Sequence, residues 1–405
     1  MTPCLICQTP IEPFITFGRM PIANGFLKED QFASEPFYEL PVGFCDRCKM
    51  VQLTTLVDAD KMFHENYAFF SSTSTRMAAH FQAFAEGVKA KYLGPDPFVV
   101  EIGSNDGIMM QHFAKAGIRH LGVEPSANVA AVARTKGINT ICEFFGVELA
   151  QRIVAEHGQA DAFLGANVMC HIPVMHSVVG GIKLLLKPKG VLIFEDPYLG
   201  DIIEKPSYDQ VYDEHAFYFS VTSLDYLFAQ HDLEIVDVAP QHTHGGSMRY
   251  TVAHRGAWPV SPAVTAQRAK EQALGLSQAA TYTQFRRNVE QSRTDLMALL
   301  RRLKAEGKRV VAYGATSKST TVTNYCGITP DLVEFISDTT PIKQNKFSPG
   351  VHIPIKPHAD FAARHPDYAL LFAWNHGEEI KAKETAFTAR GGRWIVYVPC
   401  VEVQS

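Results

Sequence analysis

The sequence predicts an α/β protein with three parts: an N-terminal zinc-binding module, a central Rossmann-like domain and a smaller C-terminal Rossmann-like domain. Two C-x-x-C pairs near the amino terminus predict the first part. Apolar strands alternate with helix-like segments from about residue 97, and the same alternation resumes near residue 308. We place the domains at residues 1–70, 71–258 and 259–405.

The composition excludes several classes of protein. The 405 residues carry 38 basic and 42 acidic side chains, so a dedicated nucleic-acid partner is not expected. No segment approaches the roughly 20 consecutive apolar residues that cross a bilayer, and the first residues contain no apolar signal segment. We therefore expect a cytoplasmic protein with no membrane partner, either a monomer or a weak oligomer.

The N-terminal module is predicted to hold a structural zinc ion. Cys4 and Cys7 form one C-x-x-C pair, Cys45 and Cys48 form the other, and 37 residues separate them. Four thiolates satisfy a tetrahedral Zn²⁺ and leave no position open for catalysis. The alternative is two unrelated pairs of buried or redox-active cysteines. The intervening segment "GRMPIANGFL" is expected to be a loop that lies over another domain.

The central domain begins with a strand and a glycine turn, "PFVVEIGSNDG", followed by a helix and a second strand that ends at Glu124. Glu124 comes 23 residues after Glu101, the spacing of one βαβ unit with an acid for ribose hydroxyls. Gly103 allows a ligand to approach the backbone. Both NAD and S-adenosylmethionine (SAM) use this arrangement.

The tip of the turn favours SAM. The pattern is E-x-G-x-x-x-G, and Asn105 and Asp106 occupy its tip. A dinucleotide places its pyrophosphate at the helix start, where an acid repels it, whereas SAM carries cationic sulfonium and amino groups. Further strands follow at "NTICEFFG", "ADAFLGANVMCHIP" and "GVLIFEDPYLGD". Ligands bind at the carboxyl ends of such strands, so the predicted cofactor residues are Glu101, Gly103, Asn105, Asp106, Glu124, Pro125, Ser126, Phe144 and Asn167.

The C-terminal part repeats the pattern of strand, turn and helix after one or two long helices. Its turn "GATSKS" lacks the second glycine of a phosphate-binding P-loop, so ATP hydrolysis is not expected. Thr316, Ser317 and Lys318 in and beside this turn still offer hydroxyl, amide and ammonium groups for a pyrophosphate. A second strand of this domain ends at Asp338.

The motifs "EIGSNDG", "GVEPS", "CHIP", "FEDPYLGDI", "YDEH", "HGGSMRY", "GATSKS" and "LLFAWNH", with the zinc pairs before them, resemble the nucleotide-sugar C-methyltransferases over nearly the whole chain. The resemblance implies SAM-dependent methylation of a carbon in a nucleotide-linked 4-keto sugar, on a dTDP or GDP carrier. It also implies that the C-terminal domain closes one side of the cleft. Asp338, Asn375 and His376 would then lie with the pyrophosphate turn, although His376 could instead cap the following helix.

The same resemblance places the segment around Tyr67 and Ser72 over the active site, where Tyr67 would contact the reacting groups and Ser72 the cofactor. The alternative is a simple linker helix. Within "QVYDEHAFYFS", Tyr212, Glu214 and His215 provide groups that hold or move protons.

Carbon methylation of this kind needs a base near neutral pH and a hydrogen-bond donor for an enolate oxygen. We predict that His215 is the base, that Tyr212 or a nearby group stabilises the enolate, and that His171 assists. Glu214 is expected to orient the histidine or to bind a sugar hydroxyl or amine. The alternative is that Tyr212 and His215 have no catalytic role and form a hydrogen-bonded pair at the start of a strand.

Other functions remain open at this point. An O- or N-methyltransferase would keep the cofactor motifs without needing a base beside an enolate. A zinc-containing nucleic-acid-binding protein and a scaffold without catalysis are further alternatives. The residues leave open the nucleotide base, an amine or hydroxyl at C-3, methylation at C-3 or C-5, and its stereochemistry.

Overall fold

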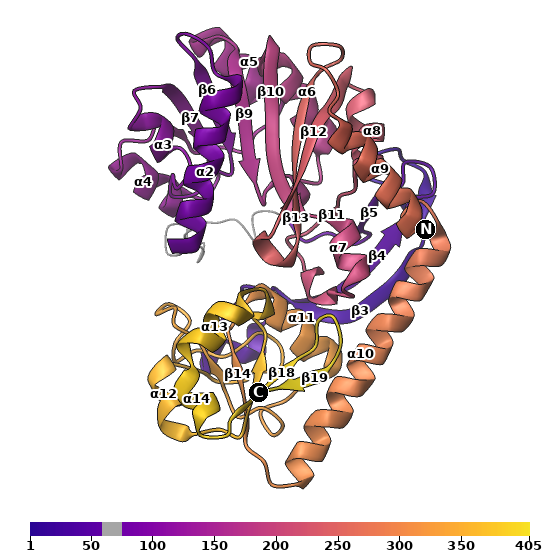
Figure 1. Cartoon of the computed structure of the whole chain (residues 1–405), viewed down its shortest axis with the longest axis vertical. Coiled ribbons are helices and arrows are strands. Elements are labelled where there is room, and N and C mark those ends of the chain that lie inside the picture. Colours follow the sequence, from indigo (N-terminus) through magenta and orange to yellow (C-terminus); the bar gives the residue numbers. More distant parts are fainter. Residues whose placement is uncertain (59–74) are drawn as a thin grey trace.

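The computed structural model describes residues 1–58 and 75–405, and it has the predicted α/β architecture of three parts. The central sheet and its helices lie at one end and the C-terminal sheet lies at the other, with the N-terminal strands running between them (Figure 1). The predicted positions Tyr67 and Ser72 lie outside the described residues. None of the helices in the described ranges combines the length and the apolar character that a membrane crossing requires.

The N-terminal module contains a small hairpin of β1 (Thr2–Pro3) with β2 (Pro10–Ile11) and a larger antiparallel sheet. That sheet has the order β11-β5-β4-β3, in which β11 (Phe217–Tyr218) comes from the central part. The module therefore completes its sheet with the strand that directly follows the "YDEH" motif. Its remaining elements are β3 (Pro13–Pro21), η1 (Glu29–Ser34), β4 (Phe37–Phe44) and β5 (Val51–Leu53).

The central sheet has the order β12-β13-β10-β9-β6-β7-β8, and all pairs are parallel except those that involve β13. Parallel order places the carboxyl ends of β6, β7, β9 and β10 along one edge. The strands are β6 (Phe98–Ile102), β7 (Arg119–Val123), β8 (Thr140–Ile141), β9 (Ala160–Ala166), β10 (Leu186–Pro197), β12 (Leu233–Gln241) and β13 (Ser247–His254).

Helices cover both faces of this sheet, as expected when strands alternate with helices (Figure 1). They are α2 (Thr75–Tyr92), α3 (Gln111–Ala114), α4 (Ala127–Thr135), α5 (Val147–His157), α6 (Met175–Leu185) and α8 (Val221–Ala229). The short α7 (Leu199–Glu204) lies beyond the carboxyl edge of the sheet, where Leu199 and Ile202 join the core that contains β3. Short 3₁₀ turns follow β9 and α7 and precede β13, and these carry several site residues. They are η3 (Met169–His171), η4 (Tyr208–Gln210) and η5 (Thr243–Gly245).

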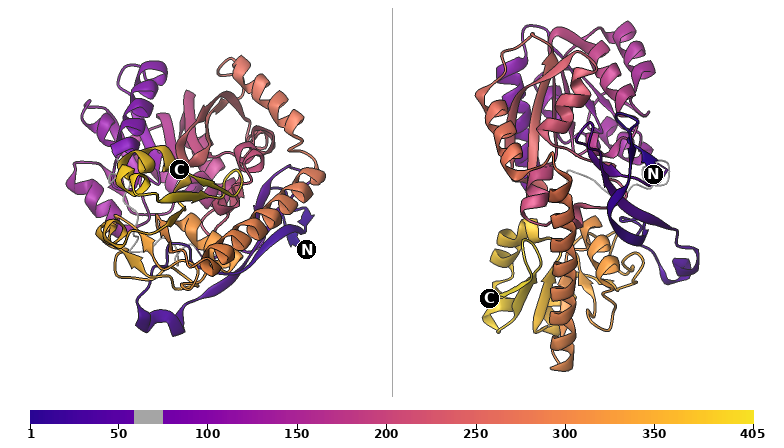
Figure 2. Two further views of the ribbon diagram at one scale, coloured as in Figure 1. Left: turned by 60° about the horizontal axis from the view of Figure 1, so that its bottom comes forward. Right: turned by 90° about the vertical axis from the view of Figure 1, so that its right-hand side faces the viewer.

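Two helices connect the central and C-terminal parts. Helix α9 (Pro262–Leu274) begins with proline at its first position and ends at Gly275, which has a left-handed backbone. Its buried Glu271 accepts hydrogen bonds from Tyr198 Oη at 2.9 Å and from Val221 N at 2.7 Å, so α9 packs on the central part. Helix α10 (Ala279–Ala305) then runs the length of the C-terminal part (Figure 2).

The C-terminal sheet has the order β16-β15-β14-β17-β18-β19, with only β19 antiparallel among the described pairs. A single apolar core contains β3 together with α10, α11 and this sheet, so the N-terminal and C-terminal parts are packed as one body. The elements are β14 (Val310–Tyr313), α11 (Ser317–Cys326), β15 (Ile336–Ser337), β16 (Ile355–Lys356), α12 (His358–Arg364), β17 (Tyr368–Leu371), η6 (Trp374–His376), α13 (Gly377–Lys383), α14 (Thr385–Ala389), β18 (Arg393–Val396) and β19 (Glu402–Gln404).

Candidate active site

The two cysteine pairs meet in one cluster. The sulfur atoms of Cys4, Cys7, Cys45 and Cys48 all lie within 4.8 Å of one another. Cys4 Sγ is 3.5 Å from Cys48 Sγ, and Cys7 Sγ is 3.4 Å from Cys45 Sγ. These separations are close to the roughly 3.8 Å expected between sulfurs that share a tetrahedral zinc ion. The alternative of two unrelated cysteine pairs is therefore wrong.

The two pairs also share one backbone geometry. Gln8 N donates to Cys4 O at 2.9 Å, and Lys49 N donates to Cys45 O at 2.8 Å. Gln8 and Lys49 both have φ of 60°, so each pair turns back in the same way. These matched turns aim four sulfurs at one point and leave no coordination position for a substrate, which is the arrangement of a structural zinc site.

The glycine turn after β6 is built for a close ligand. Gly103 has φ of +60°, and a Cβ atom there would lie 2.7 Å from Val168 Cγ2. At the end of β7, Glu124 accepts hydrogen bonds from Asn105 N at 3.0 Å and from Ser126 N at 2.8 Å. These bonds fix the carboxylate of Glu124 at the carboxyl edge of the sheet, where it can accept from ribose hydroxyls.

Several buried polar atoms at this edge have no hydrogen-bond partner among the described residues, including Glu101 Oε2, Ser126 Oγ and Asn167 Oδ1. Leaving such atoms unpaired costs free energy, so their concentration indicates a missing polar ligand. Burial, followed by the charges of Glu124 and Asp106, raises the pKa of Glu101 well above its usual value. A cationic ligand would relieve this repulsion, and SAM carries both a sulfonium and an ammonium group.

The remaining predicted cofactor residues border the same edge. Asp106 Oδ2 pairs with Lys136 Nζ at 3.0 Å, so part of its carboxylate is already occupied. Phe144 follows β8 and is 54% exposed, unusual for a large aromatic side chain, and is available to cover an adenine ring. Pro125 lies between Glu124 and Ser126, and its carbonyl accepts from Cys142 Sγ at 3.4 Å.

Replacing Gly103 with alanine is expected to weaken SAM binding by at least about tenfold, because the new methyl group collides with Val168 and the left-handed backbone becomes strained. Calorimetric titration with SAM measures the change. Gly117→Ala is the matched control, because Gly117 also has a left-handed backbone (φ +68°) but has open space around its Cβ position. Equal affinity in the Gly103 and Gly117 variants would contradict this role.

His215 is buried at the meeting point of the three parts. Its Nδ1 lies 2.7 Å from the carbonyl oxygen of Gln210. A carbonyl only accepts, so Nδ1 carries the hydrogen and Nε2 presents a lone pair. Burial, followed by the neighbouring His171, lowers the pKa of His215 well below its usual value. The ring is therefore neutral with an unprotonated Nε2, and the same shift makes it a weaker base than an exposed histidine.

Other aromatic and histidine groups surround this ring. The Tyr212 ring centroid lies 4.0 Å from that of His215, and the His171 ring centroid lies 5.2 Å from it on a stacked geometry. Burial also lowers the pKa of His171 to about 4. The structure thus brings together Tyr212, His215 and His171, and the Tyr212 and His215 rings are tilted by 36° to each other.

Glu214 lies beside them in a separate network. It accepts a hydrogen bond from Asn24 Nδ2 at 2.6 Å, and Asn24 Oδ1 accepts from Ser317 Oγ at 2.9 Å. Burial and the nearby charge of Asp213 raise the pKa of Glu214 to about 8. Asn24 comes from "GRMPIANGFL", which is only in part the expected loop, because its first residues continue β3.

The predicted pyrophosphate residues begin α11. Thr316 Oγ1 accepts from Ser319 N at 3.1 Å, so the Thr316 side chain caps the helix. Lys318 is buried, donates to the carbonyl of His244 at 2.9 Å and lies over the Trp374 ring. Burial lowers the pKa of Lys318 to about 8. The carboxylate of Asp338 accepts a hydrogen bond from Ala315 N at 2.7 Å and therefore holds the backbone of the turn in place.

Asn375 and His376 lie in η6, which contacts η5 next to His244. His376 occupies the N-cap position of α13, but its side chain makes no cap hydrogen bond there. The charge of His376 nevertheless influences His244, which places His376 at the junction with the central part.

Sequence reasoning missed several residues that tie the parts together. Gln210 Nε2 donates to the carbonyl of His244, the same oxygen that Lys318 contacts. Buried Asp209 accepts from Trp374 Nε1 at 2.6 Å and from Tyr397 Oη at 2.8 Å. Only Val211 separates Asp209 and Gln210 from the "YDEH" motif, and this nearness to the motif is the signal that the sequence contained.

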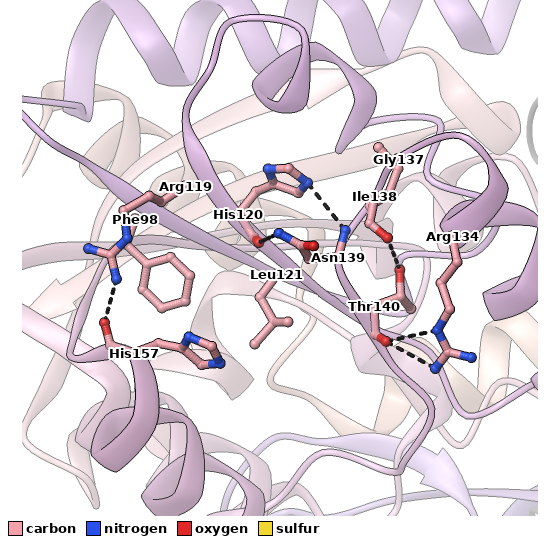
Figure 3. Close-up of a pocket in the computed structure, with 10 residues that line it drawn as sticks. All are labelled: Phe98, Arg119, His120, Leu121, Arg134, Gly137, Ile138, Asn139, Thr140 and His157. Atoms are coloured by element: carbon pink, nitrogen blue, oxygen red, sulfur yellow. Dashed lines mark hydrogen bonds between the residues drawn. The ribbon is translucent and has the colours of Figure 1, made fainter.

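A surface cavity of about 620 Å³ lies at the opposite edge of the central sheet (Figure 3). Phe98 and Arg119 stand at the starts of β6 and β7, and His157 stands at the end of α5. The Arg119 guanidinium donates to the carbonyl of His157 at 2.7 Å. Ligands of parallel sheets bind at the carboxyl ends of the strands, so this cavity is not the candidate active site.

Comparisons with known proteins agree with this geometry. Residues 4–63 match a zinc binding domain model, residues 71–238 match a methyltransferase domain model, and residues 242–399 match the model of a C-methyltransferase C-terminal domain. The C-methyltransferase NovU of Streptomyces niveus is 36% identical over 388 residues, which cover 95% of this chain and 92% of NovU.

Two solved structures resemble part of the chain at lower similarity. A SAM-dependent methyltransferase from Anabaena variabilis is 17% identical with a TM-score of 0.36, over 43% of this chain and 84% of that one. The magnesium protoporphyrin IX methyltransferase of Synechocystis with bound SAH is 15% identical with a TM-score of 0.35, over 43% of this chain and 82% of that one.

The family models and the full-length relative agree with the four-cysteine cluster and with the polar edge of the central sheet. The cofactors are accordingly SAM and a structural zinc ion in the N-terminal module. The chain belongs to the SAM-dependent C-methyltransferases that carry a zinc-binding domain.

Proposed function

We propose that this protein methylates C-3 of a nucleotide-linked 4-keto deoxysugar, on a dTDP or GDP carrier, through an enolate formed by His215. The observation that carries the proposal is the buried His215 ring, whose Nδ1–H is held by the Gln210 carbonyl at 2.7 Å. A buried neutral imidazole with one free lone pair is suited to remove a proton from carbon. The 36% identity to a C-methyltransferase supports carbon as the acceptor.

The ketone at C-4 makes the neighbouring C–H bond acidic enough for a protein base. His215 Nε2 takes the proton, and the electron pair of the C–H bond moves into the enolate, whose negative charge develops on the C-4 oxygen. Tyr212 beside His215 is the predicted donor to that oxygen. SAM, when bound, supplies an electrophilic methyl group to the enolate carbon. His215 afterwards returns its proton to solvent.

Glu214 is suited to a neutral role toward the sugar. Its pKa is raised to about 8 by burial and by the charge of Asp213, so it is protonated at neutral pH. A protonated carboxyl donates one hydrogen bond and also accepts, which fits a sugar hydroxyl or amine. We assign His171, stacked on His215, to the orientation of the base.

The C-terminal part is assigned to the nucleotide end of the substrate. Ser317 and Lys318 begin α11. The backbone N–H groups at the start of this helix and the ammonium group of Lys318 favour the binding of an anion. Lys318 is buried, and its ammonium group donates to the His244 carbonyl and lies over the Trp374 ring. A phosphate oxygen can take the place of that carbonyl. Asn375 and His376 are assigned to the same cleft.

Hydrogen exchange at C-3 tests the proposal directly. In deuterated water without SAM, the wild-type protein is expected to exchange the C-3 hydrogen of a nucleotide-linked 4-keto sugar, because the enolate forms and is reprotonated. Mass spectrometry or NMR of the recovered sugar measures this. An O- or N-methyltransferase needs no such enolate, so methyl transfer to oxygen or nitrogen without exchange at C-3 would overturn the proposal.

Gln210 is expected to position the base. Gln210→Ala removes the amide that anchors η4 to the His244 carbonyl and so loosens the backbone oxygen that holds His215 Nδ1. One hydrogen bond is worth about 1 kcal/mol, so we expect kcat to fall roughly fivefold with little change in the KM for SAM. The control is Gln241→Ala, whose amide bonds the Ala239 carbonyl at the exposed end of β12. A change in KM for SAM with unchanged kcat would contradict this role.

A further inference from the structure

The candidate active site contains a second group of metal-ligating side chains. Cys170 and His171 close η3 after β9, and His215 approaches them from the "YDEH" motif. One ligand atom from each of these three residues lies within 4.8 Å of the other two. Cys170 and His215 are buried, at 1% and 3% exposure, so bulk water does not compete freely for them.

A buried carboxylate lies next to this group. Asp196, at the end of β10, is 0% exposed, and both of its carboxylate oxygens lack a hydrogen-bond partner among the described residues. Its negative charge adds to burial in raising the pKa of the Cys170 thiol, which places the two side chains in close proximity. Burial raises the pKa of Asp196 to about 7, and the thiol and backbone of Cys170 and the backbone of Val168 offset part of that rise. A cation at this position would stabilise the ionised carboxylate further.

The orientation of His215 also fits a metal ligand. A ligating histidine usually donates its second ring N–H to a carbonyl or carboxylate, which fixes the lone pair toward the metal. The bond from Nδ1 to the Gln210 carbonyl at 2.7 Å fixes His215 in this way. The lone pair on Nε2 is therefore available either to a proton or to a metal ion.

We propose that Cys170, His171 and His215, with Asp196 beside them, form a second metal site that binds a thiophilic divalent cation such as Zn²⁺ and thereby blocks the base. One sulfur and two nitrogen ligands with a neighbouring carboxylate are a donor set that zinc prefers. Binding forms a metal–sulfur bond and releases the thiol proton of Cys170 to solvent. The effect on turnover rests on the proposed function, because the metal occupies the Nε2 lone pair that would accept the substrate proton.

Cobalt(II) is a suitable probe for the site. It prefers the same tetrahedral sulfur and nitrogen ligands but binds more weakly than zinc, so it leaves the zinc of the four-cysteine cluster in place. Full-length protein that contains one zinc ion per chain is titrated with Co²⁺ in the absence of substrate. We expect one further equivalent to bind, with the charge-transfer absorption of a cobalt–thiolate bond.

Cys170→Ser is expected to abolish that absorption and to weaken Co²⁺ binding at least about tenfold. Replacing a residue that only hydrogen-bonds a metal ligand already weakens metal binding by about tenfold or more, and Cys170 would be a ligand itself. Cys170→Ser is also expected to raise the Zn²⁺ concentration for half inhibition by a similar factor, relative to the rate of the variant without added metal. Cys400→Ser, which removes an exposed thiol, is the control and should bind Co²⁺ like the wild type.

His171→Gln provides an independent variant if Cys170→Ser does not fold. It should keep the thiolate absorption but bind Co²⁺ at least about tenfold more weakly. No second equivalent in the wild type, or the same absorption in Cys170→Ser, would overturn the site. Binding of Co²⁺ as expected without inhibition would instead remove His215 from the proposed reaction and leave the metal site standing.

Discussion

Replacing His215 with asparagine is expected to lower turnover by at least about 100-fold, the lower range of what a positioned general base contributes. Asparagine can retain a hydrogen bond to the Gln210 carbonyl, the partner of His215 Nδ1, but it has no basic lone pair that can take a proton from carbon. Hydrogen exchange at C-3 should disappear together with methyl transfer. Binding of SAM should change little, because the predicted cofactor residues lie on the loops after β6, β7, β8 and β9.

The matched control for this variant is His365→Asn. His365 is exposed and has a left-handed backbone with φ of 47°, a conformation that asparagine tolerates well. Its replacement should leave both turnover and exchange at the wild-type level. Normal exchange at C-3 in His215→Asn, with the sugar and SAM still bound, would assign the base to another group. His171, stacked on His215, would then be the first residue to test.

The parts of the site that could be predicted are those in which chemistry and geometry are local. Each cysteine pair folds its own turn, so two C-x-x-C spacings were enough to predict the zinc site. Gly103 and Glu124 belong to one βαβ unit, in which the chain itself fixes the distance between turn and acid. The buried imidazole of His215 followed from its place beyond β10 and from the family resemblance.

The parts that could not be predicted depend on distant segments. Asn24 meets Glu214 across 190 residues of sequence, and no spacing rule connects a loop of the zinc module with the "YDEH" motif. In the same way, β11 completes the sheet of the N-terminal module, so residues 1–70 are not the whole of that unit. The roles proposed for Tyr67 and Ser72 stay predictions.

Local hydrogen bonding also redirected some predicted substrate residues. Thr316 and Asp338 have the polar side chains that a pyrophosphate would need, yet Thr316 caps α11 and Asp338 accepts from the backbone of the turn. Both groups shape the loop, and their predicted contacts with a pyrophosphate stay predictions. The side chains of Ser317 and Lys318 contact the neighbouring parts. A sequence shows which side chains are polar. Whether a polar side chain holds the protein backbone in place or binds a ligand depends on the folded structure.

Cys48→Ser is expected to remove the structural zinc and to abolish turnover even though the cluster holds no open position for a substrate. Cys48 is buried and its sulfur lies 3.5 Å from that of Cys4, so serine leaves only three thiolates in the cluster. The free energy of binding a structural zinc ion, about 10 kcal/mol or more in isolated zinc-finger peptides, is also folding free energy. Zinc content and thermal unfolding measure the loss.

The effect reaches the active site because the zinc module supports it directly. Strand β5 pairs with β11 immediately after His215, Ala23 N donates to Asp213 Oδ1 at 3.0 Å, and Asn24 holds Glu214. SAM affinity should fall much less than turnover, since the cofactor loops belong to the central sheet. Cys400→Ser, at an exposed thiol, should change neither quantity. If Cys48→Ser lost zinc but kept full turnover, the zinc module would not be what holds the "YDEH" motif in its reactive position.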